Sequence, residues 1–255
     1  MDPAPPHGTA VVASVPALAG HVYDWTVTGA TLTGGQGTSA VTLATGAVGG
    51  AIGLFVTDAI AGCRSGGSRT VPIEFLDVPA AHPFHGAIAA MDQRGLSTGC
   101  GGGNFCPDAP VTRSQMAVFV MRLVEGAAYK PPAPEGSVFA DVPLGTFLGD
   151  WIEELADRGF TTGCGGGNFC PDEPLNRAAA AVFLLRAEHG AGHHPPPATG
   201  AVFDDVPLGT FLGNWIEELA AEGITAGCAP GKFCPDKVVT RGEMAAFVSR
   251  GFPVE

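Results

Sequence analysis

The sequence has little lysine, little basic charge and no long apolar run, and each shortage excludes a class of protein. Only three lysines are present, and 13 basic residues stand against 25 acidic ones, which gives a formal net charge of −12. Such a surface repels nucleic-acid phosphates and anionic lipid head groups, so we expect neither as a partner. The longest apolar stretch, residues 47–56, is too short for a membrane span, which needs roughly 18 residues.

Motifs that carry catalysis are also missing. The sequence has no Gly-x-Ser-x-Gly nucleophile turn, no phosphate-binding loop and no His-Glu-x-x-His helix. Adjacent acids such as Glu153 and Glu154 point to different sides of a helix, which does not suit joint acid–base chemistry. The sequence therefore predicts a protein that is not an enzyme and that uses no cofactor.

What the sequence does have is a unit that recurs three times with a period of 64 residues. Residues 138–164 and 202–228 are identical at 21 of 27 positions. A short unit of this kind buries its apolar face only by packing on its neighbours, which gives repetition a physical reason. The equivalent positions include Phe75, Phe139 and Phe203, then Cys100, Cys164 and Cys228, then Arg113, Arg177 and Arg241.

Six of the seven cysteines form pairs that bracket five residues. A loop that is so short and rich in glycine brings two Cα atoms within disulfide distance, so we predict three local disulfides and an oxidising compartment. Metal binding by the thiolates is the alternative, although zinc sites usually add a second cysteine pair or histidines. The chain starts without a secretory leader, so export implies that a leader was removed or that the chain is a fragment. The pairs are Cys100 with Cys106, Cys164 with Cys170 and Cys228 with Cys234.

Each unit is predicted to contain a helix, a turn closed by the disulfide, and a second helix. In the second copy the first helix is predicted over residues 146–158 and the second over residues 176–188. The first helix carries an apolar stripe that we assign to the core, while its acids are expected to face water. The stripe consists of Phe147, Leu148, Trp151, Ile152 and Leu155, and the acids are Glu153, Glu154 and Asp157.

An arginine at the first position of every second helix is the main candidate for function. Thr112 and Thr240 begin capping boxes, and Asn176 is a good cap without the reciprocal partner. A cation at that position opposes the helix macrodipole at a cost of up to ~1 kcal/mol, so another interaction must favour it. One explanation is an ion pair with an aspartate; the other is an anionic ligand held by the guanidinium and free helix-terminal amides. The aspartates considered are Asp77, Asp141 and Asp205, or Asp108, Asp172 and Asp236.

Together these motifs resemble the S-layer homology domain, in the subgroup whose loop reads Gly-Cys-x4-Phe-Cys-Pro. The first copy shows the order as a Phe-x-Asp-Val start at Phe75, glycines at 95 and 99, a Phe-Cys-Pro turn at 105–107 and Thr-Arg-Ser-Gln-Met-Ala at 112–117. The resemblance covers residues 73–252, a complete set of three. It implies a mainly α fold with pseudo-threefold packing and an extracellular location at the bacterial cell envelope.

The resemblance also implies a ligand, namely acidic and often pyruvate-bearing cell-wall polysaccharide, held in grooves between repeats by the arginine of the Thr-Arg motif. Copy two reads Leu175-Asn-Arg-Ala-Ala instead, so we rank its site below the other two. The alternative is a structural protein whose repeats associate with other surface-protein subunits in a lattice or filament, with the arginines as internal ion pairs. The implied ligand-binding residues are Arg113, Arg177 and Arg241 with their caps Thr112, Asn176 and Thr240; no metal site is expected.

The first 72 residues differ in kind, because alternating apolar and polar residues predict antiparallel strands between glycine-rich turns. They resemble a PKD-like or immunoglobulin-like sandwich with Trp25 in its core. Residues 1–18 are proline-rich and predicted to lack an opening strand, and Cys63 has no evident partner, so we expect an N-terminally truncated domain.

The predicted organisation is thus multidomain, an all-β domain over residues 1–72 followed by repeats over 73–126, 137–190 and 201–252. Proline-rich stretches over 127–137 and 190–201 are predicted to be extended spacers between repeats. His193 and His194 lie in the second stretch. We expect both histidines to be solvated rather than bound to a metal.

Overall fold

The computed structural model describes residues 10–14, 17, 19, 21–28, 30–45, 50–58, 64–71, 75–101 and 103–253. The chain divides into two compact units, Met1–His85 with Ser97–Cys106, and Gly86–Leu96 with Pro107–Glu255. The first repeat therefore contributes residues to both units. Cys63 lies outside the described residues, and the hypothesis about its partner stays a prediction.

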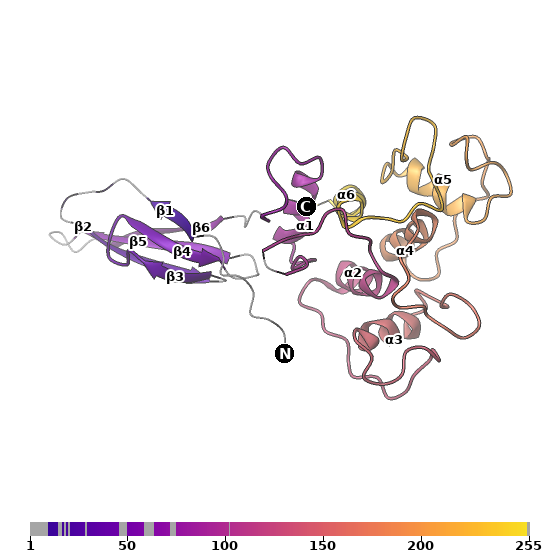
Figure 1. Ribbon diagram of the computed structural model, residues 1–255, viewed down its shortest axis with the longest axis horizontal. Helices are drawn as coiled ribbons and strands as arrows, with labels where there is room; N and C mark the ends of the chain where they lie inside the picture. Colours follow the sequence, from indigo (N-terminus) through magenta and orange to yellow (C-terminus); the bar gives the residue numbers. More distant parts are fainter. Residues whose placement is uncertain are drawn as a thin grey trace. The chain divides into compact units, whose positions relative to one another are not determined.

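The described strands of the first unit form two antiparallel three-stranded sheets (Figure 1). One sheet has the order β1 (Ala10–Ser14), β4 (Ala40–Thr45), β3 (Ala30–Gly34). The other has the order β2 (His21–Thr28), β5 (Gly50–Asp58), β6 (Arg64–Val71). The presence of β1, paired with β4 so that Ala13 lies opposite Val41, corrects the prediction that residues 1–18 supply no strand.

Trp25 on β2 is buried, as predicted, with 7% of its surface exposed. Its indole N–H donates to the carbonyl of Thr38 at 2.8 Å, which satisfies the polar edge of a ring that is otherwise out of water. Thr38 lies in the segment that connects β3 to β4. A β-bridge between Tyr23 and Gly37 also holds this segment against β2. Assignment of these strands to a PKD-like or immunoglobulin-like sandwich stays a prediction.

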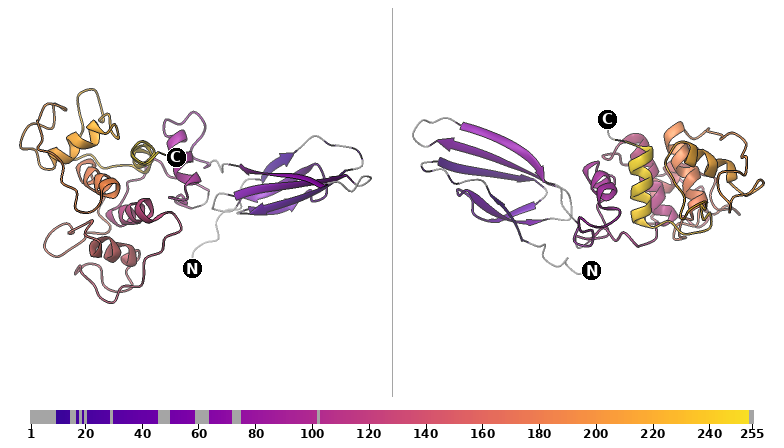
Figure 2. Two further views of the ribbon diagram at one scale, coloured as in Figure 1. Left: turned by 180° about the vertical axis from the view of Figure 1, so that it is seen from behind. Right: turned by 90° about the horizontal axis from the view of Figure 1, so that it is seen from above.

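The second unit is built from helices, and the second helices of the repeats lie side by side in its middle (Figure 1). α2 packs against α4, and α4 packs against α6; α2 also packs on α3, and α4 on α5. Figure 2 shows α4 and α6 next to each other from above. α2 and α4 thus each cover the first helix of the following repeat, as the repetition predicts. The helices are α1 (His85–Gln93), α2 (Arg113–Glu125), α3 (Gly149–Asp157), α4 (Arg177–His189), α5 (Gly213–Ala221) and α6 (Arg241–Gly251).

The first helix of repeat two begins later than predicted. Leu148 has a left-handed backbone with φ of 60°, so the helix starts at Gly149 and leaves Phe147 outside it. Phe147 is 84% exposed, and its equivalent Phe211 is 83% exposed. The prediction that Phe147 belongs to the core is therefore wrong, because a left-handed residue turns the chain before the helix begins.

The acids of this helix were also misassigned in part. Glu153 was expected to face water, but it is 5% exposed and accepts a hydrogen bond from Val138 N at 2.9 Å. Its equivalent Glu217 accepts from Thr199 N at 2.7 Å and from Gly200 N at 2.6 Å. These glutamates fix the end of the preceding proline-rich stretch, because its backbone amides need acceptors once they are removed from water.

The exposure of Phe147 leads to a first prediction on stability. Phe147→Ala should change the free energy of unfolding by less than about 0.5 kcal/mol, as surface substitutions usually do. Leu155→Ala on the same helix should cost about 2–5 kcal/mol, because Leu155 is fully buried. Urea denaturation of the oxidised protein measures both. A loss above about 1 kcal/mol for Phe147→Ala would mean that this ring is packed in solution.

The turns between the two helices of each repeat are closed by the predicted disulfides, Cys100–Cys106, Cys164–Cys170 and Cys228–Cys234. We call each such turn the crosslinked loop. Its entry requires glycine, as at Gly163, where φ is +88° and a Cβ atom would lie 2.2 Å from the carbonyl oxygen of Asn168. Next to it, Cys164 N donates to that same oxygen at 2.8 Å.

The segments that lead into α2, α4 and α6 are joined in a closed ring of backbone hydrogen bonds. Val111 N donates to Val239 O at 3.0 Å, Val239 N to Leu175 O at 2.9 Å, and Leu175 N to Val111 O at 2.8 Å. The three side chains are at most 1% exposed. Each repeat thus donates to one partner and accepts from the other, which is the cyclic relation that pseudo-threefold packing requires.

Candidate functional site at the joints between repeats

The caps of the second helices hold the positions predicted for them. Thr112 Oγ1 accepts from Gln115 N at 3.3 Å, Asn176 Oδ1 accepts from Ala179 N at 2.8 Å, and Thr240 Oγ1 accepts from Glu243 N at 3.2 Å. The capping box is complete at α2 and α6, as predicted from the Gln and Glu at the third helical position. The cap side chains are therefore engaged by their own helices.

The first two amides of each central helix donate to a neighbouring repeat. Arg113 N donates to Glu173 O and Ser114 N to Pro171 O, both at 3.0 Å. Arg177 N donates to Lys237 O at 2.9 Å, and Arg241 N donates to Ala109 O at 2.9 Å. The explanation by an anion held at free helix-terminal amides is therefore wrong for these first amides. We call this contact, between the start of a central helix and the segment that follows the disulfide of another repeat, a joint.

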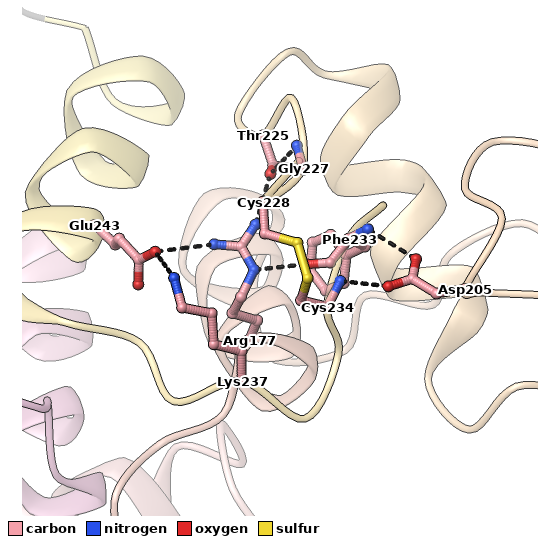
Figure 3. The surroundings of a disulfide bond; sticks show 9 residues. All are labelled: Arg177, Asp205, Thr225, Gly227, Cys228, Phe233, Cys234, Lys237 and Glu243. Atoms are coloured by element: carbon pink, nitrogen blue, oxygen red, sulfur yellow. Dashed lines mark hydrogen bonds and ion pairs between the residues drawn. A yellow bond between two sulfur atoms is a disulfide. The ribbon is translucent and has the colours of Figure 1, made fainter. Parts of the chain in front are cut away.

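The Arg177 joint holds its guanidinium on several sides (Figure 3). Nε donates to Phe233 O at 2.7 Å, Nη2 donates to Thr225 Oγ1 at 3.3 Å, and Nη1 lies 3.9 Å from a carboxylate oxygen of Glu243. The rings of Phe233 and Phe247 lie 4.8 and 5.1 Å from the guanidinium carbon. Arg177 is only 2% exposed.

Burial lowers the pKa of Arg177, and the negative charges of Glu243 and Asp205 oppose that shift. Acceptors and carboxylates of the neighbouring repeat thus compensate the positive charge of Arg177. Because the donor is charged, its hydrogen bonds are strong and offset the unfavourable interaction with the helix dipole.

The phenylalanine whose carbonyl accepts from the arginine also donates its own N–H to an aspartate, at both Phe169 and Phe233. Asp205 accepts from Phe233 N and Cys234 N, both at 2.8 Å (Figure 3). Burial raises the pKa of Asp205, but the backbone hydrogen bonds outweigh it and lower the pKa overall. Asp205 therefore fixes the Phe233 peptide, and the carbonyl of that peptide receives Arg177. The direct ion pair considered between an aspartate and this arginine is thus replaced by an indirect contact through the Phe233 peptide group, and the described ion pair of Arg177 is with Glu243.

The Arg113 joint has the same plan, but two of the three polar partners described for Arg177 have no described counterpart. Nε donates to Phe169 O at 2.7 Å, and Asp141 accepts from Phe169 N at 2.8 Å. The position equivalent to Glu243 is Ala179, which has no carboxylate to offer. Among the described residues, Arg113 Nη2 is buried without a hydrogen-bond partner. Burial lowers the pKa of Arg113, and the charges of Glu173 and Asp141 only oppose it.

The third predicted arginine, Arg241, is also placed at the start of its helix and is 7% exposed. All three predicted ligand-binding arginines therefore lie where repeats meet. Their surroundings differ, because Arg177 is enclosed and has acceptors around its guanidinium, whereas Arg113 is half-buried.

A second set of arginines was not singled out from the sequence. Arg122, Arg186 and Arg250 share the period of 64 residues, which was the signal that could have found them. Their Nη1 atoms donate to the carbonyls of Leu96, Phe160 and Ile224 at 3.2, 2.9 and 3.4 Å. Arg122 and Arg186 also lie over Trp151 and Trp215, at 5.5 and 5.3 Å from the ring centres. They fasten the turn that follows the first helix of each repeat.

The proline-rich stretches, which are predicted to be extended spacers, also contact the first helix of the repeat that follows them. Tyr129 donates from its hydroxyl to Glu154 Oε1 at 2.6 Å. At the equivalent position, His193 Nε2 lies 2.6 Å from Glu218 Oε2, and its ring meets Trp215 edge-on at 5.8 Å. His193 is thus docked on α5, and only His194 keeps the exposed character expected of both histidines.

Comparison with known proteins agrees with this geometry. The family model of the S-layer homology domain matches residues 74–117, 139–181 and 203–245. A cell surface protein of Thermoanaerobacter kivui is 36% identical over 124 residues, covering 48% of this chain and 16% of that protein. An S-layer protein of Bacillus thuringiensis subsp. finitimus is 30% identical over 181 residues, covering 69% of this chain and 21% of that protein.

A cellulosome-anchoring protein of Acetivibrio thermocellus is 28% identical over 159 residues, covering 60% of this chain and 32% of that protein. The chain thus spans at most about a third of the length of these relatives. Within the residues that the structure describes, no helix has the length and apolar character needed to cross a membrane.

Proposed function

Because the chain belongs to the S-layer homology domain family, we propose that it anchors a longer surface protein to the bacterial cell envelope by binding acidic wall polysaccharide at the joints between repeats. Relatives named as S-layer and cellulosome-anchoring proteins support such a role. The protein would then act outside the cell, by binding and not by catalysis. Three disulfides are consistent with that location, because they persist in oxidising compartments.

The observation that carries the proposal is the unpartnered Nη2 atom of Arg113. A buried guanidinium nitrogen without an acceptor costs free energy, so the half-buried Arg113 side chain would gain by turning toward a carboxylate that a ligand supplies at the surface. At the Arg177 joint the protein supplies Thr225 and Glu243 itself. We therefore propose the Arg113 joint as the principal site and rank the Arg177 joint last, with Arg241 between them.

The ligand class follows from membership of the family, and the charge of the chain limits where such a ligand could bind. The chain carries a net charge of −12, so an acidic polymer is repelled by most of the surface and is attracted only where arginines emerge. A pyruvate ketal fits this requirement, because its carboxylate can accept two hydrogen bonds from a planar guanidinium. Repetition of acidic sugars along one polymer would add avidity to weak individual contacts.

Comparison of the repeats suggests a variant that tests the Arg113 site. Ala179→Glu gives Arg113 the carboxylate that Glu243 gives Arg177, so the ligand would be displaced without removing the arginine. We expect Ala179→Glu and Arg113→Gln each to lower co-sedimentation with cell-wall sacculi of the source bacterium by about tenfold, the loss that corresponds to one good charged contact. Mild acid, which releases ketal-linked pyruvate, should abolish binding of the unchanged protein.

Thermal unfolding serves as the control, because Ala179→Glu should not lower the melting temperature. Binding of both variants at the level of the unchanged protein would exclude the Arg113 joint as the site. Failure of the unchanged protein to bind untreated sacculi would instead favour self-association in a surface lattice. The exposed side chains of Phe147 and Phe211, flanked by Leu144 and Leu208, give that second function an apolar surface to use.

A further inference from the structure

Two histidines and three glutamates gather between repeats two and three, at the end of α4 that lies away from Arg177. His189 Nε2 lies 2.7 Å from Glu222 Oε1, and the rings of His189 and His193 are 4.5 Å apart. The side chains of His189 and Glu222 are 35% and 25% exposed, so solvent and ions can reach them. We call this group the histidine cluster; it consists of Glu188, His189, His193, Glu218 and Glu222.

Between repeats one and two, the equivalent positions form an arginine-centred network instead of a histidine cluster. There Arg158 pairs with Glu125, donates from Nε to Glu154 Oε1 at 2.6 Å and donates from Nη2 to Tyr129 Oη at 3.0 Å. One guanidinium thus joins the end of α2 to α3 and balances two carboxylates. The positions run in register with the histidine cluster, as Val124, Glu125, Tyr129, Glu154 and Arg158.

In the histidine cluster this central cation is missing from the sequence. Glu222 occupies the position equivalent to Arg158, and Glu188 occupies the position equivalent to Val124. The described ion-pair partners of Glu222 and Glu218 are the histidines His189 and His193. Burial, followed by the charge of Glu222, raises the pKa of Glu188. A cation from solution would restore the balance that Arg158 provides elsewhere.

We propose that the histidine cluster binds one divalent transition-metal ion of the zinc type, with Glu188, His189 and Glu222 as its protein ligands. One ligand atom from each of these residues lies within 4.8 Å of the others. Imidazole and carboxylate are ligands that zinc accepts readily, and an exposed site leaves further positions for water. With a neutral histidine the three ligands carry two negative charges, which a divalent ion neutralises.

The bound ion would link the last residue of α4 to the end of α5, as Arg158 links the equivalent elements one repeat earlier. His193 borders the site, since it stacks on His189 and is hydrogen-bonded to Glu218. Such neighbours orient a ligating imidazole. The site is distinct from the arginine joints, so this inference does not rest on the proposed polysaccharide binding.

The test uses the full oxidised chain without a histidine tag, freed of metal with EDTA. Zinc chloride is titrated in by calorimetry, and cobalt chloride is followed by visible absorption. We expect one ion per chain and a melting temperature that rises with zinc and returns after EDTA. Glu222→Arg places an arginine at the position of Arg158, within reach of Glu218, and should abolish zinc binding while the chain stays folded. His189→Gln should weaken binding at least ~10-fold.

His194→Gln is the matched control, because His194 is exposed and belongs to the same stretch; its zinc affinity should equal that of the unchanged protein. Circular dichroism checks that each variant is folded. The proposal is overturned if the unchanged chain shows no saturable zinc binding up to millimolar concentration. It is equally overturned if folded Glu222→Arg and His189→Gln bind zinc as the unchanged protein does.

Discussion

Arg177→Met is expected to destabilise the protein by about 3 kcal/mol, because the change leaves buried acceptors of the next repeat without their donor. Methionine keeps much of the length and the contact with Phe233 and Phe247, so the loss reports on Phe233 O and Thr225 Oγ1 rather than on a cavity. Equilibrium urea denaturation with the disulfides intact measures it. Arg113→Met should cost less, about 1–2 kcal/mol, since one of its donors already lacks a partner.

Arg158→Met is the appropriate comparison, because this arginine also joins two repeats but is 34% exposed, and exposed ion pairs contribute about 0–1 kcal/mol. If Arg177→Met cost no more than Arg158→Met, the Arg177 joint would not be a stabilising contact. The arginine would then be available for a ligand, contrary to its low rank in the proposed function.

Val239→Pro is expected to be at least as damaging, with a loss of about 3 kcal/mol or more. Proline has no N–H, so the bond from Val239 to Leu175 O is lost and the ring around the central helices opens. The neighbouring Val238→Pro should change the free energy of unfolding by less than about 1 kcal/mol. Prolines already occupy its equivalent positions, at Pro110 and Pro174.

Thermal and urea unfolding of the two variants side by side measures the difference between adjacent positions. Equal losses for Val238→Pro and Val239→Pro would show that proline harms this segment by its shape alone. A ring bond of the kind observed between Val239 and Leu175 would then have no measurable value.

The features that the sequence could predict are those in which the determining residues are close along the chain. Thr112 caps a helix through Gln115, three residues away, and Cys164 meets Cys170, six residues away. Local geometry decides both, so pattern and spacing suffice. The start of the second helix in repeat two, with its cap at Asn176, was predicted for the same reason.

The features that could not be predicted depend on atoms that are distant in sequence or that belong to the backbone. The acceptor of Arg177 is the carbonyl of residue 233, and every residue has a carbonyl, so no side-chain pattern marks it. The burial of Glu153 depends on the amide of Val138, which only the path of the preceding stretch brings near. The left-handed turn at Leu148 has no glycine or asparagine to announce it.

Ala179 illustrates an intermediate case. The sequence shows that repeat two departs from the Thr-Arg motif and also lacks the reciprocal capping residue at Ala179, and the departure from the motif is the reason to rank the site of that copy lower. The structure places the consequence in a neighbouring repeat, at Arg113, because the missing carboxylate would have served that guanidinium as Glu243 serves Arg177. The sequence shows that Ala179 replaces a glutamate or glutamine, but it does not show that the effect falls on Arg113 in another repeat.

The ring formed by Val111, Leu175 and Val239 sets the number of repeats. In an open stack of repeats, a further copy adds to one end and leaves the others as they were. In a closed ring, each copy supplies a donor to one partner and an acceptor to the other, and three copies complete the circuit. A fourth copy would find no partner, and a loss would leave two half-made contacts. Each repeat of such a module can therefore differ in place, as Arg158 and Glu222 do at equivalent positions, whereas an added repeat would have to break the closed ring.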